Sequence, residues 1–167
     1  MTRDDLLRWA DADGAPDQLP ELVRRLIHET ARESLETLDF PGGSGVTTGG
    51  FDRFARSSRA TPFVPAGSSV WELSVRNGAA KKADEDIAKR DAVPDGSAVD
   101  QTTYIQVITR AWTKAADWGR DWTVKSGWKR VEGCNVDRLA AWVEHGPATH
   151  LAPRAPRQAG RRRRVWQ

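Results

Sequence analysis

The chain has 167 residues, of which 38% are hydrophobic and 29% are charged, and this size and balance fit one folded domain. It contains no apolar run near the roughly 20 residues that a membrane span requires, and its acidic N-terminus lacks the apolar core of a signal peptide. The single cysteine, Cys134, excludes an internal disulfide and a thiolate zinc cage, and we expect a cytoplasmic protein.

The positive charge is concentrated at the C-terminus. The net charge is +3, but residues 151–167 contain six arginines and no acid. With these six set aside from the 26 Lys and Arg residues, 20 remain against 23 Asp and Glu. The overall charge is therefore no argument that the body of the chain binds nucleic acid. We expect residues 151–167 to be a disordered basic tail, either merely solvated or acting as a nucleic-acid arm.

The N-terminal part predicts one clear helix. Residues 1–17 are polar apart from Leu6, Leu7 and Trp9, and we expect a short helix or a loose arm there. Residues 18–38 predict a helix, because apolar residues recur at i, i+3 and i+4 spacing. They are Leu19, Leu22, Val23, Leu26 and Ile27, with Leu35 and Leu38 extending the stripe.

Strand patterns follow. Residues 40–45, FPGGSG, predict a turn, and residues 46–55 alternate around a glycine pair, which predicts two short strand pieces joined by a bend. Residues 70–75 predict a strand with two distinct faces. Trp71, Leu73 and Val75 would share one face, and Val70, Glu72 and Ser74 the other.

Helices and strands alternate in the second half. The predicted helices are 78–90, 111–126 and 136–145, the last capped by Asn135, and the predicted strands are 103–109 and 128–131. This order favours an α/β fold over residues 18–150, with a mixed central sheet flanked by helices.

Three residues could carry phosphodiester chemistry. Asp52 follows a glycine pair, Glu72 interrupts an apolar strand, and Lys82 belongs to the helix after that strand. Each has an ordinary alternative: a turn aspartate, a glutamate on the solvated sheet face, and a lysine on a solvated helix face. Together, two carboxylates on neighbouring strands can hold one Mg²⁺, and a nearby lysine can stabilise the charge that develops on a phosphate.

The segments GGFDRF, VWELS, KKADEDIAKR and TTYIQVITRAW resemble the restriction-endonuclease-like domains of the PD-(D/E)xK type. Such domains occur at the N-terminus of multidomain bacterial anti-phage and NTPase-linked proteins, and the resemblance spans about residues 19–150. It implies a restriction-endonuclease-like core and a metal-dependent DNA endonuclease that uses Mg²⁺ or Mn²⁺.

The resemblance also implies roles for residues. Asp52 matches the first acid and Glu72 the second, which makes both metal ligands. Ser74 stands where the lysine of the motif is expected, so Lys82 becomes the catalytic lysine. An additional acid is expected on the first helix, with Glu29 favoured over Glu21.

The expected partners are DNA rather than RNA, and a second copy of the chain or a sensor or NTPase partner, with no membrane. An alternative function stays open because Ser74 and Arg53 depart from the family pattern. In that alternative the same fold is a catalytically inactive module for nucleic-acid binding or assembly. A self-contained toxin is a third, weaker interpretation.

Overall fold

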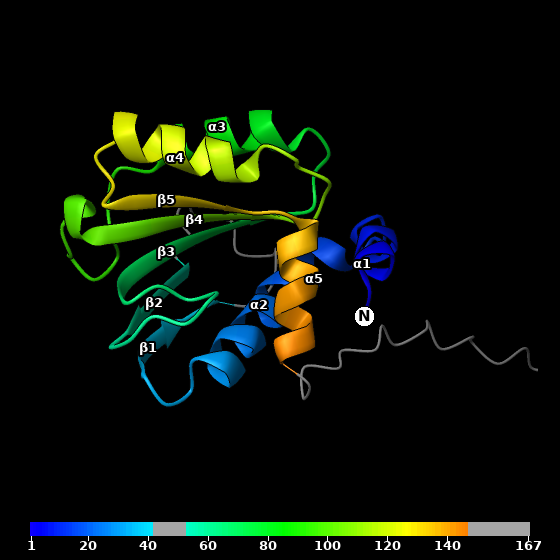
Figure 1. The fold of residues 1–167 in the computed structure, drawn as a ribbon, viewed down its shortest axis with the longest axis horizontal. Coiled ribbons are helices and arrows are strands. Elements are labelled where there is room, and N and C mark those ends of the chain that lie inside the picture. The colour runs from blue at the N-terminus through cyan, green and yellow to red at the C-terminus, as the bar shows by residue number, and fades with distance from the viewer. Residues whose placement is uncertain (42–52, 147–167) are drawn as a thin grey trace, which may run out of the picture.

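The computed structural model describes residues 1–41 and 53–146, and its centre is a five-stranded sheet with helices on both faces (Figure 1). The helices are α1 (Arg3–Ala10), α2 (Ala15–Thr30), α3 (Ala79–Lys89), α4 (Ala115–Lys125) and α5 (Val136–His145), with a short 3₁₀ turn at Val99–Gln101. The strands are β1 (Leu35–Asp39), β2 (Arg53–Ser57), β3 (Gly67–Ser74), β4 (Thr102–Ile108) and β5 (Arg130–Cys134).

The sheet is mixed, and its strands follow chain order, β1-β2-β3-β4-β5. β1, β2 and β3 form an antiparallel meander, whereas β3, β4 and β5 are parallel. Parallel neighbours need a crossover connection, which α3 and α4 provide. Both crossover helices cover one face of the sheet, and α2 and α5 lie on the other (Figure 1). The predicted α/β class with a mixed, helix-flanked sheet is therefore confirmed.

A core of large aromatic residues fills the α2–α5 side of the sheet. Trp71 of β3 lies with its ring centroid 5.8 Å from that of Trp142 on α5, and Phe63 stacks on Trp142 at 5.5 Å. The predicted apolar stripe of α2 packs here, with Leu22, Val23 and Leu26 almost fully buried.

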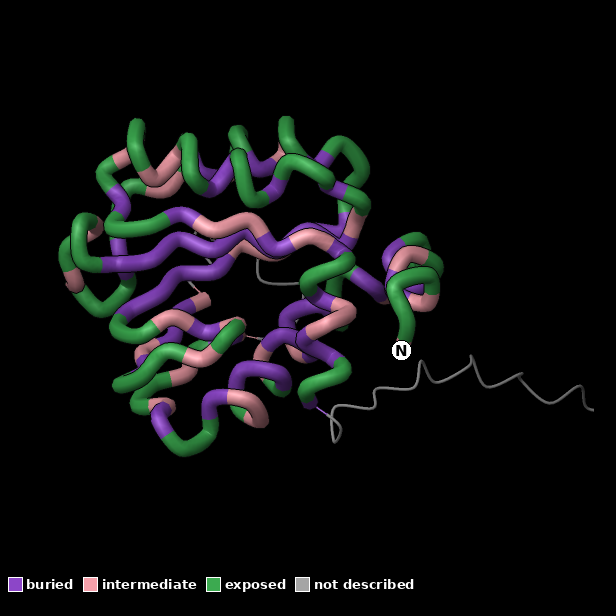
Figure 2. The backbone as a smooth tube through the Cα atoms, in the orientation of Figure 1, coloured by how far each residue is buried: buried purple, intermediate pink, exposed green. Residues whose placement is uncertain are grey.

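A second core lies between the sheet and the pair α3–α4. It contains Val70 of β3, Tyr104 and Ile108 of β4, and the inward residues of α3, Ala79, Ala83 and Ile87. All seven residues of β4 are buried, because this strand lies inside the sheet with helices over both faces (Figure 2). The two-faced prediction for residues 70–75 is confirmed, since Val70 belongs to this core and Trp71 to the other.

The prediction that one helix spans residues 18–38 is wrong, because α2 ends at Thr30 and residues 35–39 form β1. Leu35 and Leu38 both pack on the α2–α5 core although they are three residues apart. The pairing of β1 with β2 shifts register between Leu35 and Thr37, and this irregularity returns both leucines to one face. A bulged strand therefore imitates the helical spacing.

The first 17 residues are part of the folded domain. Leu6 of α1 is fully buried, the indole of Trp9 donates to Gln18 at 2.8 Å, and α2 already begins at Ala15. In the strand region predicted over 46–55, only residues from Arg53 onward are described, and they begin β2. No helix among the described residues is long and apolar enough to cross a membrane.

Candidate functional site

Glu72 lies on β3 and faces α3, on the same side of the sheet as Val70. Its side chain is 24% exposed and accepts a hydrogen bond from Nη1 of Arg90, at 2.9 Å from its Oε1. Arg90 follows the last residue of α3, and its side chain is 9% exposed. A carboxylate in the middle of the sheet is thus partly withdrawn from water and compensated by a cation from the adjacent helix.

The helix α3 brings a second ion pair to the same place. Gly78, with φ of 74°, provides the left-handed turn from which the helix starts, and Ala83 and Ile87 hold it on the sheet. Lys82 and Asp86 are four residues apart, so they lie on one side of the helix. Nζ of Lys82 donates to Oδ1 of Asp86 at 2.6 Å, and both side chains are largely covered.

A chain of hydrogen bonds continues from this ion pair into the sheet. The other carboxylate oxygen of Asp86 accepts from Nε2 of Gln106 at 3.0 Å, and Oε1 of Gln106 accepts from the hydroxyl of Tyr104 at 2.8 Å. Gln106 and Tyr104 are fully buried on β4, and Gln106 pairs in register with Glu72. The buried amide and phenol hold the Asp86 carboxylate, which in turn positions Lys82.

The charges in this cluster act on one another. Burial raises the pKa of Glu72, and the negative charge of Asp86 adds to that rise, while Arg90, Arg53 and Lys82 oppose it. Burial also lowers the pKa of Arg53, against the attraction of Glu72. We call Arg53, Glu72, Lys82, Asp86 and Arg90 the charge cluster; it combines three cations with two carboxylates over a poorly solvated stretch of sheet.

Glu72 and Lys82 thus belong to one cluster, in which Glu72 binds Arg90 and Lys82 binds Asp86. Asp52 lies outside the described residues. Glu29 lies near the end of α2, in the helix layer on the opposite face of the sheet from α3 (Figure 1). There it lines a separate pocket of about 400 Å³ with Arg32 and Arg59.

Three members of the site were not found from the sequence. Asp86 lies one helical turn after Lys82, a spacing that indicates an ion pair but not where it points. Gln106 is the one amide within the apolar run TYIQVI, which is a usable signal for a buried polar contact. Arg90 could be assigned to Glu72 only from the packing of α3 on the sheet.

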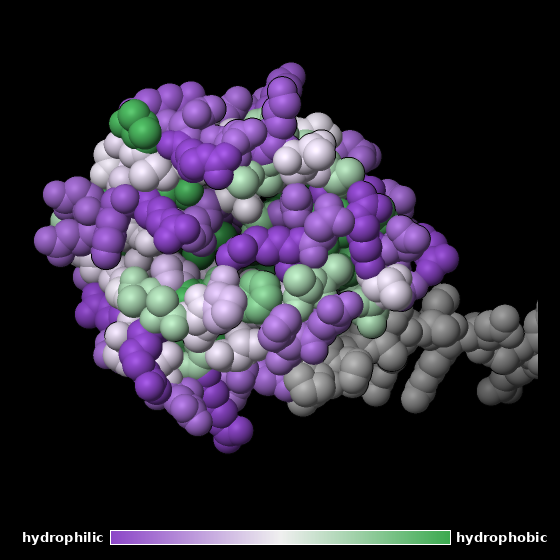
Figure 3. All heavy atoms as spheres, in the orientation of Figure 1, coloured by the Kyte–Doolittle hydropathy of each residue, from purple (hydrophilic) through white to green (hydrophobic). Residues whose placement is uncertain are grey.

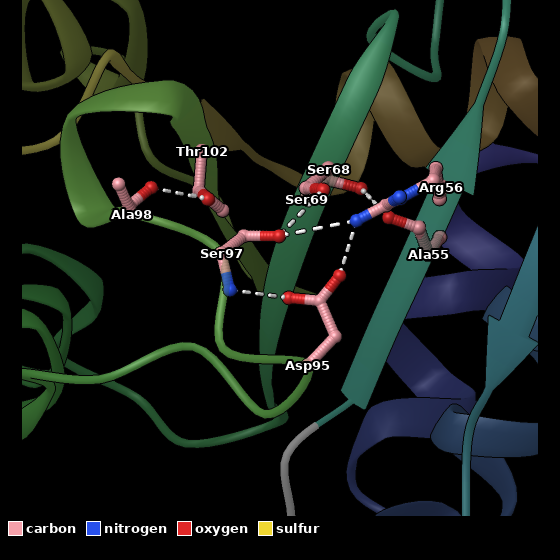
Figure 4. Close-up of polar contacts among 8 residues, drawn as sticks. All are labelled: Ala55, Arg56, Ser68, Ser69, Asp95, Ser97, Ala98 and Thr102. Carbon is pink, nitrogen blue, oxygen red and sulfur yellow. Dashed lines mark hydrogen bonds and ion pairs between the residues drawn. The ribbon is translucent and has the colours of Figure 1, made fainter.

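A different polar cluster connects the loop after α3 to β2 and to the start of β3, whereas Glu72 lies near the end of β3 (Figure 4). The guanidinium of Arg56 donates to Asp95 and, at 3.1 Å, to the hydroxyl of Ser97, which also meets Ser68 at 3.3 Å. Asp95 accepts from the backbone N–H of Ser97 at 2.9 Å. These contacts satisfy one another and fasten a loop to the start of β3.

No family model, curated protein or solved structure matches the chain. The functional argument therefore depends on the geometry of the charge cluster. Within residues 1–41 and 53–146, no three His, Cys, Asp or Glu side chains come together to hold a metal ion. Any metal site built on Glu72 needs further oxygen ligands from water, from substrate or from residues outside those ranges.

Proposed function

We propose that this chain is a restriction-endonuclease-like domain that hydrolyses DNA phosphodiester bonds with a divalent metal ion, as an effector of bacterial anti-phage defence. One observation carries the proposal: Glu72, a partly buried carboxylate in the middle of a β-strand, is in register with Gln106, and the amide of Gln106 binds the Asp86 carboxylate that holds Lys82. In metal-assisted phosphodiester hydrolysis, a carboxylate can bind the metal ion, and a lysine at a site with little water can stabilise the charge that develops on the phosphate.

The order of elements supports the same proposal. The run α2-β1-β2-β3-α3-β4, with an antiparallel meander followed by a parallel crossover, agrees with the core implied by the resemblance. Arg53 of β2 pairs in register with Trp71 of β3. In the sequence, Asp52 directly precedes Arg53 and Glu72 directly follows Trp71. Each proposed acid is therefore the sequence neighbour of a residue of this pair.

The donor chemistry fits Mg²⁺ or Mn²⁺ in part. Mg²⁺ is usually held by one or two carboxylates and several waters, and Glu72 supplies one such carboxylate. Because burial raises the pKa of Glu72, an additional cation near it would favour the ionised form. Asp52 is the second carboxylate in this proposal. Bound there, the metal would supply an activated water and neutralise charge on the phosphate.

The protein side chains have separate tasks. Lys82 would stabilise negative charge on the phosphate that is attacked, and Asp86 would keep its ammonium in place. Gln106 and Tyr104 would act only by holding Asp86, so they are positioning residues.

A second candidate function rests on Arg90. Its guanidinium lies 2.9 Å from Glu72, so the carboxylate is already neutralised by a cation of the chain. In combination with Ser74 in place of the expected lysine, this arrangement favours a module that has kept the fold and lost the reaction. Such a module would bind nucleic acid or assemble without cutting.

Plasmid relaxation in Mg²⁺ or Mn²⁺, with EDTA as the blank, separates the two functions. We expect the wild type to nick supercoiled DNA, and Glu72→Gln and Lys82→Gln each to lower the rate by at least about 100-fold, since each removes a group that acts in the transition state. Glu85→Gln and Lys81→Gln are matched controls, because they remove the same charges from exposed positions of α3.

Circular dichroism establishes that each variant is folded. Equal cutting by Glu72→Gln and wild type would refute the proposed site. No cutting by a folded wild type over a range of protein concentrations would support the inactive module instead.

A further inference from the structure

A groove of about 610 Å³ runs between α4 and the edge strand β5. Its floor is built from small or apolar residues, Ala116 and Gly119 of α4 and Val131 and Gly133 of β5. The helix and the strand can lie this close together because Gly119 and Gly133 have no side chain: at either position a side chain would collide with the backbone of the other element. A Cβ on Gly119 would lie 2.7 Å from the carbonyl oxygen of Val131, and one on Gly133 would lie 2.7 Å from that of Ala115.

Cations dominate the walls of the groove. The charged residues that line it are Arg120, Lys129, Arg130 and Arg138 with a single acid, Glu132. All four cations are exposed. Arg138 donates to the carbonyl oxygen of Pro62 at 2.7 Å and lies over the ring of Phe63, so Arg120, Lys129 and Arg130 are the three that can turn toward a ligand. Because the chain outside residues 151–167 carries more acids than bases, this accumulation is local to the groove. Figure 3 shows hydrophilic side chains over the α4 and β5 region with hydrophobic ones among them, and Val124, which also lines the groove, is 88% exposed.

The existing contacts of these cations leave them able to bind an anion. Arg130 pairs with Glu132 at 3.0 Å and Arg120 with Asp117, and both arginines are more than 60% exposed, where such pairs contribute little and are screened by salt. The ammonium of Lys129 has no carboxylate partner within the described part of the chain.

The edge of β5 is poorly suited to pairing with another strand. The hydroxyl of Thr123 accepts from the backbone N–H of Val131 at 2.9 Å and lies 3.3 Å from the carbonyl oxygen of the same residue. A side chain of α4 thus occupies both backbone groups of Val131, in the middle of the edge that an added peptide strand would need. The groove is therefore built for a ligand that is recognised by charge and shape, not by backbone pairing.

We propose that this groove binds the sugar–phosphate backbone of single-stranded nucleic acid. Phosphates would meet the cations on the walls, and the apolar faces of the sugars would lie against the floor of small residues; basic grooves track single strands in this way. The site is separate from the charge cluster, none of whose residues lines the groove. Gly133 of its floor is in register with Gln106, which is in register with Glu72.

Fluorescence anisotropy with a 5′-labelled 20-residue oligothymidylate tests the proposal on the full chain. EDTA is present throughout, so metal-dependent cutting cannot contribute and the result is independent of whether the chain is a nuclease. The test variant is Lys129→Gln with Arg130→Gln. Its matched control is Arg25→Gln with Arg32→Gln, which removes the same charge from exposed positions on and after α2, in the other helix layer.

We expect the groove variant to weaken binding at least 10-fold at 50 mM salt and to lower the slope of log affinity against log salt by about 1.4. Each phosphate contact contributes about 0.7 to this slope for single strands, and the variant removes two cations. The control variant should retain wild-type affinity.

Three results would overturn the proposal. The first is an affinity of the groove variant equal to that of the wild type, and the second is an equal loss of affinity in both variants. The third is that poly-L-glutamate displaces the labelled strand as efficiently as unlabelled oligothymidylate does at the same charge concentration. The second would assign binding to overall charge, and the third would indicate an acidic protein as the partner.

Discussion

Glu72 occupies a position where an ionised carboxyl is unfavourable on its own. It interrupts an apolar strand between Trp71 and Leu73, and its side chain is three-quarters covered. Burial raises its pKa above the ordinary value of 4.5 and Asp86 adds to the rise, whereas Arg90, Arg53 and Lys82 oppose it. A group in this state gains from any further cation, which is a property of many functional carboxylates.

This raised pKa predicts how Glu72→Gln changes stability with pH. Since the folded state holds the Glu72 proton more tightly than the unfolded state, ionisation costs the wild type stability as pH rises from about 4.5 to the folded pKa. We expect the free energy of unfolding of Glu72→Gln, relative to wild type, to increase through this window and to level off above it. Urea unfolding at a series of pH values measures the difference.

The opposite trend would show that the cations outweigh burial. A difference that falls as pH rises would place the folded pKa of Glu72 below 4.5 and contradict an upward shift. Glu85→Gln is a suitable comparison, because Glu85 is an exposed acid of the neighbouring helix.

Part of the candidate site could be predicted residue by residue. Glu72 stands out because a charged residue inside an apolar strand needs an explanation, and Lys82 because it follows in the next helix. Arg90 is 18 positions from Glu72 in the chain, and Gln106 is 20 positions from Asp86. Contacts of such separation depend on how α3 lies across β3 and β4, which no local pattern contains.

Among the helices and strands, α4 and β5 make a very close approach. Gly119 lies within a helix, where glycine is usually unfavourable by about 1 kcal/mol relative to alanine. Its use is explained by the backbone of Val131 and Glu132, which leaves no room for a side chain. The same contact forms the floor of the basic groove.

Gly119→Ala is expected to lower the free energy of unfolding by about 1–2 kcal/mol, although alanine is the better helix former. The new Cβ would lie 2.7 Å from a carbonyl oxygen of β5, and backbone cannot move aside as a flexible side chain can. Denaturant unfolding measures the change. Gly127→Ala is the control, since its Cβ would meet only Val99 at 3.9 Å, and we expect it to be neutral or slightly stabilising. Equal effects of the two substitutions would refute the close-packing argument.

β1 illustrates why one element was assigned wrongly. Leu35 and Leu38 have helical spacing, and only the register shift against β2 explains how a strand can turn both toward one core. The buried hydroxyls of Ser34 and Ser57, 2.9 Å apart, fasten the start of β1 to the end of β2. Because these contacts join residues 19 to 23 positions apart, periodicity within the segment could not show them.

Across the whole molecule, the N-terminal helix is a part of the domain. The first turn of α1 has a capping box between Thr2 and Asp5, and Leu6 and Trp9 enter the same core as α2 and α5. Arg110, two residues after β4, donates at 2.8 Å to Asp11 just beyond α1. The first and last helices that the structure describes, α1 and α5, thus pack in one core.

We expect Leu6→Ala to lower the free energy of unfolding by about 2–5 kcal/mol, the usual cost of emptying a buried leucine site. Arg8→Ala in the same helix removes an exposed side chain and should change stability by less than about 0.5 kcal/mol. Thermal unfolding of both variants checks this. If Leu6→Ala left the free energy of unfolding unchanged, α1 would not contribute to the stability of the domain.

The sequence by itself determined the α/β class, the two faces of β3, the positions of α3 and α5 and the asparagine cap of α5, because each follows from periodicity or from contacts a few residues apart. Only the tertiary structure decided that residues 35–39 form an edge strand, that Arg90 and Asp86 act on Glu72, and that a cationic groove follows β5. These features join segments distant in the chain, and their energies arise only when the helices lie on the sheet.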